Sequence, residues 1–150
     1  MYDDLLYLLT SLDGVPQDPR HHPEGDALFH ALQVFEHALR ADAEPELLAA
    51  ALLHDIGKAV QTRDHARIGA QDLEGLMPSR VVWLVRHHMD LHHDPRRTRA
   101  LLLGTPQLKA LEQLRAWDVA GRDPHAWVMS PEEAVARLLA HFDRSGAAAR

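Results

Sequence analysis

The sequence predicts an all-α fold, a compact bundle of about six to eight helices. Apolar residues recur at helical spacing through most of the chain, and no segment shows the strict alternation typical of a half-buried strand. Several segments also begin with helix-start signals, either a capping residue or a proline in the expected first turn. These observations favour helices packed around one apolar core.

The first expected helix runs from Tyr2 to Leu12 and stops at the turn signal Asp13-Gly14. Residues 15–26 contain three prolines and should form a loop. A second helix should extend from Asp26 or Ala27 to Ala41, because Asp26 is a suitable N-cap and apolar residues follow at helical spacing.

Pro45 should open the third helix, whose apolar run 48–53 leads directly into His54 and Asp55. Gly57 fits a stop signal at the C-terminal end of this helix. A shorter helix is expected over residues 64–76. The third helix therefore places a histidine and a carboxylate where its buried part ends.

Pro78 should open another helix, whose apolar face continues into His88 and His92. His87 points about 100° away from His88 on such a helix, so the two cannot share the centre of one face. The basic segment 94–99 reads as a loop, followed by a helix over residues 107–121.

The last helix has the clearest start signal in the chain. Ser130 is its N-cap, Pro131 lies in its first turn, and Glu133 completes a capping box. We expect a frayed tail over residues 145–150.

Length and composition predict one domain over residues 1–150, with its core at about 14–142. The net charge of −6 argues against broad electrostatic binding to nucleic acid, and the absence of cysteine excludes thiolate metal ligands. No basic and apolar leader is present, and no apolar run reaches the roughly 20 residues that span a bilayer. We therefore expect a cytoplasmic protein without a membrane partner.

On otherwise apolar helix faces, or directly at their ends, the sequence places four histidine or aspartate residues: His30, His54, Asp55 and Asp118. Each has an ordinary explanation by itself: His30 as a core histidine, or Asp118 paired with a neighbouring arginine. Together they would be costly to bury without a common partner, and a shared divalent cation satisfies all of them. Histidine and carboxylate are suitable ligands for such an ion.

These residues stand in the order His, His-Asp, Asp that is typical of the HD-domain metal-dependent phosphohydrolases. The segments HPEGDALFH, LLHDIGK, DHARIGA, VRHHM and WDVAGR resemble the HD domain of bacterial CCA-adding tRNA nucleotidyltransferases. The resemblance covers residues 14–122. The nucleotidyltransferase head, with its Gly-Ser and Asp-x-Asp motifs, is missing, so tRNA end synthesis does not carry over.

The resemblance implies that His30, His54, Asp55 and Asp118 bind a divalent ion, which could be Mn, Fe, Ni, Co or Mg. A second ion would use His65 with His88 or His87, and Asp55 would bridge the two. The alternative is one ion, with His65 and His88 contacting the substrate. Metal-activated water would attack phosphorus, with Asp55, Lys58 and His65 as catalytic residues.

The expected function is hydrolysis of a nucleotide-type phosphoester, such as a 2′,3′-cyclic nucleotide or a nucleotidase substrate, with an RNA end as a further possible partner. Cationic side chains should hold the phosphate: Lys58, Arg86, Arg97 and Arg122. His22 and Glu24 would line the pocket or orient a ligand. The alternative is a nucleotide- or RNA-binding module whose metal is structural.

Overall fold

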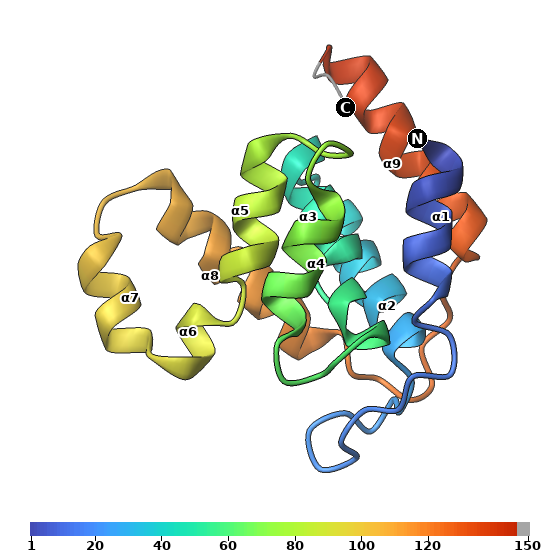
Figure 1. The fold of residues 1–150 in the computed structure, drawn as a ribbon, viewed down its shortest axis with the longest axis horizontal. Helices are drawn as coiled ribbons and strands as arrows, with labels where there is room; N and C mark the ends of the chain where they lie inside the picture. Colours follow the sequence, from blue (N-terminus) through green and yellow to red (C-terminus); the bar gives the residue numbers. More distant parts are fainter. Residues whose placement is uncertain (147–150) are drawn as a thin grey trace.

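The computed structural model describes residues 1–146 and confirms the all-α prediction (Figure 1). Over this range the only extended pairings are isolated bridges, Pro16 with Asp26 and Glu74 with Met77. No helix in the described part of the chain is long and apolar enough to cross a membrane. Most of the tail predicted to fray, residues 147–150, lies outside the described range.

The helices are joined mostly by short connections, with longer loops between α1 and α2 and between α8 and α9. In chain order they are α1 (Tyr2–Thr10), α2 (Ala27–Arg40), α3 (Pro45–Leu53), the 3₁₀-helix η1 (Ile56–Ala59), α4 (His65–Leu73), α5 (Ser79–His87), α6 (Asp90–His93), α7 (Pro95–Leu101), α8 (Pro106–Ala120) and α9 (Pro131–Ser145).

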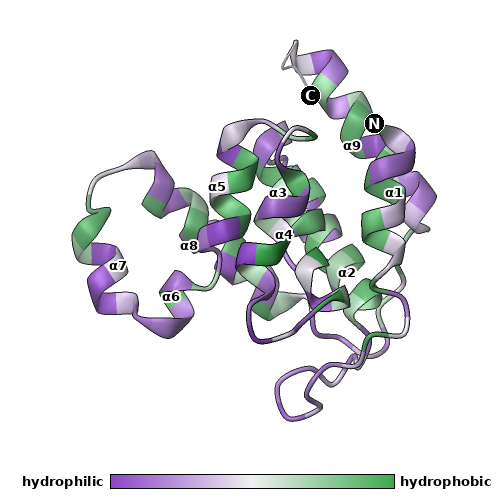
Figure 2. Cartoon of the chain, in the orientation of Figure 1, coloured by the Kyte–Doolittle hydropathy of each residue, from purple (hydrophilic) through white to green (hydrophobic). Residues whose placement is uncertain are grey.

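Helix α3 is the centre of the bundle (Figure 1). Every residue from Leu47 to Leu53 is buried, and α3 packs against α2, α5, α8 and α9. Helix α1 covers α9 on one side, while α6 and α7 extend from the opposite side and are largely polar (Figure 2). Because α3 is surrounded on several sides, the polar side chains at its end are buried. They must therefore find hydrogen-bond or charge partners in the protein itself or in a ligand.

The predicted caps at two helix starts are confirmed. Asp26 Oδ2 accepts a hydrogen bond from the Phe29 amide at 2.9 Å, and Ser130 Oγ accepts one from the Glu133 amide at 3.1 Å. Pro45 and Pro131 both lie in the first turn of their helices. Local sequence chemistry therefore sets where these helices begin.

The prediction of a loop over residues 94–99 is wrong, because α7 begins at Pro95. Asp94 accepts a hydrogen bond from the Arg97 amide at 3.2 Å and caps the helix, while Pro95 occupies its first turn. The start signals outweigh the run of positive charge. The helix opened near Pro78 also ends at His87, so His88 is its C-cap and His92 belongs to α6.

Gly57 does not cap α3 as expected; His54 is the C-cap and Gly57 lies inside η1. The reason for a glycine here is close packing. A Cβ at residue 57 would overlap the carbonyl oxygen of His65 and lie 2.8 Å from the Gly69 amide nitrogen. The missing side chain lets α4 lie directly against η1, which brings His65 close to Asp55.

Candidate metal centre

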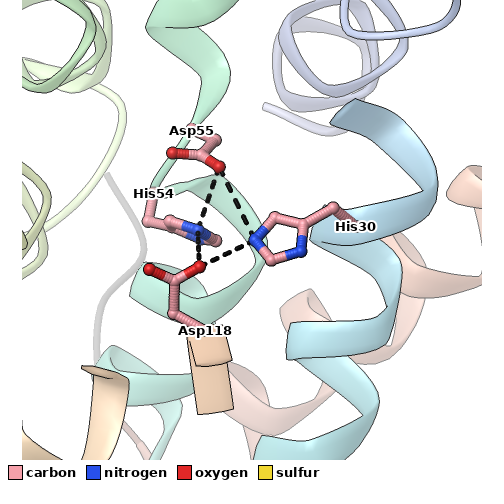
Figure 3. Close-up of side chains that lie close together, drawn as sticks. All are labelled: His30, His54, Asp55 and Asp118. Carbon is pink, nitrogen blue, oxygen red and sulfur yellow. Dashed lines mark hydrogen bonds and ion pairs between the residues drawn. The ribbon is translucent and has the colours of Figure 1, made fainter. Parts of the chain in front are cut away.

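Four side chains from three helical segments meet in the interior (Figure 3). His30 projects from α2, His54 and Asp55 follow α3, and Asp118 projects from α8. His30 Nε2 lies 2.7 Å from Asp118 Oδ1 and 3.7 Å from Asp55 Oδ2. His54 Nε2 lies 3.2 Å from Asp55 Oδ2 and 3.5 Å from Asp118 Oδ1. Two imidazole nitrogens and two carboxylate oxygens therefore surround one point.

The charge of this cluster requires a positive partner. Asp55 is 2% exposed and Asp118 is 7% exposed, so both carboxylates lie largely out of water. Buried anions are stable only when they are paired with cations or coordinate a metal. Protons on the neighbouring histidines, or a metal ion in their place, can supply the positive charge.

His54 is oriented as a metal ligand. Its Nδ1 donates to the backbone oxygen of Ala51 at 2.9 Å, which leaves Nε2 facing the carboxylates. This Nε2 is buried and makes no hydrogen bond of good geometry to any residue in the range 1–146, although both carboxylates are within ion-pair distance. A cation between these atoms satisfies the nitrogen and both anions together.

His30 is held from behind by two oxygen acceptors. Its Nδ1 lies 2.8 Å from the backbone oxygen of Gly121 and 2.7 Å from Glu24 Oε2, and the Glu24 side chain is fully buried. A Cβ on Gly121 would lie 2.9 Å from a methyl carbon of Val34, so glycine allows α8 to approach α2 closely. A carboxylate on the far nitrogen of a ligating histidine fixes its ring and raises its basicity.

A second cluster shares Asp55 with the first. Asp55 Oδ1 lies 3.2 Å from His65 Nε2 and 3.4 Å from His88 Nε2, and the two imidazole nitrogens are 3.1 Å apart. The Nδ1 atoms donate to the backbone oxygens of Thr62 at 2.8 Å and Val85 at 2.6 Å. Both Nε2 atoms therefore face each other beside Asp55, an arrangement that a cation between them would stabilise.

The metal-free cluster holds protons tightly. Burial opposes the charged form of His30, but hydrogen bonds to Asp118 and Glu24 outweigh burial and raise the pKa of His30 to about 9. Burial is likewise outweighed at His54, where mainly the charge of Asp55 raises the pKa to about 10. The pKa values of Asp55 and Asp118 lie well below the ordinary range despite burial, because His54 and His30 respectively stabilise their anions. Burial lowers the pKa of His88.

A cleft of about 270 Å³ opens onto these carboxylates. Both Asp55 and Asp118 contribute to its lining, and so do the predicted residues His22, Lys58 and Arg122. Lys58 Nζ lies 3.2 Å from Asp55 Oδ2. Glu24 does not line the cleft; it lies behind His22, whose Nδ1 is 3.2 Å from Glu24 Oε2. The cleft thus joins the carboxylates of the cluster to cationic side chains.

Three predicted site residues lie elsewhere. His87 packs against Trp83 and its Nδ1 lies 2.8 Å from Asp90 Oδ2, so the structure brings His88 to Asp55 instead. Arg86 pairs with Glu74 at 3.0 Å. Arg97 lines a separate hollow between α5 and α7. These positions follow from the end of α5 at His87 and from the folding of 95–101 as a helix.

The cleft also contains residues to which the sequence assigned no substrate role, among them Gln17, His92 and Arg115. Arg115 lies one turn before Asp118 on α8, and its NH1 is 3.5 Å from Asp118 Oδ2. Its NH2 also lies 3.1 Å from His92 Nδ1. Helical spacing from Asp118 could have identified Arg115, whereas no local signal identifies Gln17.

The class of the protein follows from this fold and cluster together with a family comparison. A family model described as the HD domain matches residues 28–147. The chain belongs to the HD domain family, and its buried histidine and aspartate cluster agrees with the metal-dependent phosphohydrolase superfamily to which that domain belongs.

The chain is also similar to individual proteins of known name. The chain is 46% identical over 75 residues to a "Multifunctional CCA protein" of Methylococcus capsulatus, covering 45% of this chain and 18% of that protein. It is 52% identical over 56 residues to the protein of the same name from Halorhodospira halophila, covering 37% and 14%. The match to the Aromatoleum aromaticum protein is 38% over 98 residues, covering 54% and 24%. The chain spans less than a quarter of the length of these relatives.

Proposed function

We propose that this chain is a metal-dependent phosphohydrolase acting on a nucleotide-type phosphoester. The observation that carries the proposal is the position of Asp55. Each of its carboxylate oxygens faces imidazole nitrogens, and the carboxylate also lines an open cleft. Such an arrangement suits a carboxylate shared between two divalent ions within reach of a substrate.

The donor set fits divalent metal ions. His30, His54, Asp55 and Asp118 would hold one ion, and Asp55, His65 and His88 would hold a second. Metal ions at such sites lower the pKa of a bound water and neutralise charge on phosphoryl oxygens. Imidazole and carboxylate suit manganese, iron, cobalt and nickel, and magnesium is a candidate for the oxygen ligands.

The chain's own cations would bind and orient the phosphate. Lys58 lies beside Asp55, Arg115 lies one turn before Asp118 on α8, and Arg122 follows the end of α8. The guanidinium of Arg122 is held by the backbone oxygens of Asp118 and His21 at 3.2 and 3.1 Å. Fixed donors of this kind are suited to planar recognition of phosphate.

The substrate class rests on similarity to proteins named "Multifunctional CCA protein". Together with the resemblance of the sequence motifs to the HD domain of CCA-adding tRNA nucleotidyltransferases, this similarity leads us to propose a 2′,3′-cyclic nucleotide or a nucleoside monophosphate, free or at an RNA end. Cationic side chains in the cleft agree with an anionic substrate although the whole chain carries a charge of −6.

The second candidate is a nucleotide- or RNA-binding module with a structural metal. Structural metal sites are closed and typically use about four protein ligands. Here His65 and His88 extend the donor set beyond four, and Asp55 and Asp118 line an open cleft. Both features favour catalysis.

The test is turnover of a phosphoester panel by purified protein loaded with each of the five metals. We expect metal-stimulated hydrolysis of at least one nucleotide, abolished by chelator. Asp55→Asn should lower kcat/KM by more than the roughly 10–100-fold typical of residues that only support ligands, whereas Asp72→Asn, at an exposed position on α4, should match the wild type. No hydrolysis with any metal, combined with tight nucleotide binding, would favour the binding module.

A further inference from the structure

Gln17 has a buried donor that the protein leaves unused. Its Nε2 is inaccessible to solvent and has no hydrogen-bond partner within residues 1–146. A buried amide donor without a partner costs about 1–3 kcal/mol. Gln17 also belongs to the lining of the cleft that contains Asp55 and Lys58. An unused donor beside a candidate active site points to a ligand that completes its hydrogen bonding.

The orientation of this amide is fixed by Lys58. Lys58 Nζ lies 2.8 Å from the Gln17 side chain, and an ammonium group has only donors, so the atom that it contacts must be the amide oxygen. The amide nitrogen is then the Gln17 atom that remains without a partner. Lys58 Nζ carries three hydrogens. It donates one to Gln17 and directs one to Asp55 at 3.2 Å, so the third is available to a ligand.

The backbone at Gln17 is also held in place. Its amide nitrogen donates to the carbonyl oxygen of Gly25 at 2.9 Å, and the Ala27 amide donates to Val15 at 2.9 Å, so the two limbs of the loop over residues 15–26 are paired. Asp26 ties the base of this loop by accepting from the Gly14 amide at 2.7 Å. A donor fixed in its backbone and at its side-chain oxygen loses little entropy when it binds a ligand.

Resting on the proposed function, we propose that Gln17 and Lys58 form a subsite for a non-reacting phosphoryl oxygen of the substrate. An acceptor that takes Gln17 Nε2–H and the third Lys58 N–H together would lie beside a fixed positive charge. That position favours an anionic oxygen over a sugar hydroxyl. Arg115 and Arg122 lie near Asp118 in the same cleft and would contact other oxygens of the ligand.

The experiment measures inorganic phosphate binding to the manganese-loaded full chain by calorimetry, without turnover. Gln17→Leu removes the amide, and Gln17→Glu keeps an acceptor for Lys58 but replaces the donor with a negative charge. We expect phosphate affinity to fall about tenfold or more in both variants, since a hydrogen bond to a charged group is lost. Gln61→Glu is the matched control: it makes the same change at an exposed position three residues beyond Lys58 and should bind phosphate as the wild type does.

Manganese content is measured for every variant alongside phosphate binding, and it should equal that of the wild type. Unchanged phosphate affinity in Gln17→Leu would overturn the subsite, and so would a loss of manganese, which would make Gln17 a support for Asp55 through Lys58. These outcomes differ from a failure of the proposed function. If the wild-type protein binds phosphate through Gln17 but cleaves no phosphoester, the subsite would stand and the proposed phosphohydrolase function would be wrong.

Discussion

At the scale of single residues, the histidines of the cluster share one orientation. His54, His65 and His88 each donate Nδ1–H to a backbone oxygen three residues earlier and turn Nε2 towards Asp55. A backbone acceptor selects the tautomer and fixes the ring without help from another side chain. The protein's own backbone therefore holds the three Nε2 atoms in position around Asp55.

This shared orientation predicts two metal ions per chain. His65→Ala and His88→Ala should each lower the metal content from about two ions towards one, because each removes a donor from the second group while the first keeps all four of its donors. His87→Ala, one residue away and paired with Asp90, is the matched control and should keep both ions. Metal analysis of chelator-free protein gives the count. A wild-type value fixed at one after reconstitution with excess manganese would contradict the prediction.

At the scale of elements, the site depends on how closely neighbouring helical segments approach. Gly57 in η1 lies directly against the backbone of α4 at His65 and Gly69. This contact sets the separation between Asp55, just before η1, and His65, the first residue of α4. Two glycines face each other here because only backbone atoms fit between the two segments.

We predict that Gly57→Ala lowers the free energy of unfolding by about 2–4 kcal/mol, because the new methyl group must displace the backbone of α4. Gly69→Ala is the comparison: its Cβ would have its nearest contacts at 3.3 Å and should cost clearly less. Urea denaturation of the metal-free proteins measures both. Equal losses in the two variants would mean that the approach at residue 57 relaxes easily.

At the scale of the whole molecule, the apolar bundle encloses a charged centre. Helix α3 is buried from Leu47 to Leu53 and leads into His54 and Asp55 in the interior, where α2 and α8 add His30 and Asp118. Burial of these groups makes the stability of the fold depend on what neutralises the carboxylates, either protons or metal ions.

We therefore predict that the stability of the metal-free protein falls as the pH rises, whereas its apparent affinity for metal increases. The folded pKa values of His30 and His54, about 9 and about 10, exceed the ordinary value of 6.5. Their contribution to metal-free stability is full below pH 6.5 and is lost as the pH rises through 9 to 10. Metal ions replace these protons, so apparent metal affinity should rise about tenfold per pH unit for each proton released.

Thermal unfolding with chelator and with manganese, between pH 6 and 8.5, tests this expectation. The melting temperature of the metal-free protein should fall with pH, and the added stabilisation by manganese should grow. A constant difference across this range would mean that the histidines are already neutral when the metal binds. Calorimetry in buffers of different ionisation enthalpy counts the released protons directly.

The sequence by itself determined the helical class, most helix starts and the members of the first histidine and aspartate cluster. Caps such as Asp26 and Ser130 act within one turn, and this cluster stands out because His30, His54 and Asp118 interrupt apolar stripes. Such signals are local, so they can be recognised along the chain without knowledge of distant contacts.

Only the tertiary structure placed His88 rather than His87 beside Asp55, placed Arg86 and Arg97 away from the cleft, and revealed the buried amide of Gln17 and the packing role of Gly57. The choice of histidine depends on where α5 ends, and the cleft depends on segments that lie far apart in sequence. Periodicity describes which face of a helix is buried, but it does not say which loop or helix covers that face. Contacts between segments that are distant in sequence determine which segment covers the face, and these contacts form only when the chain folds.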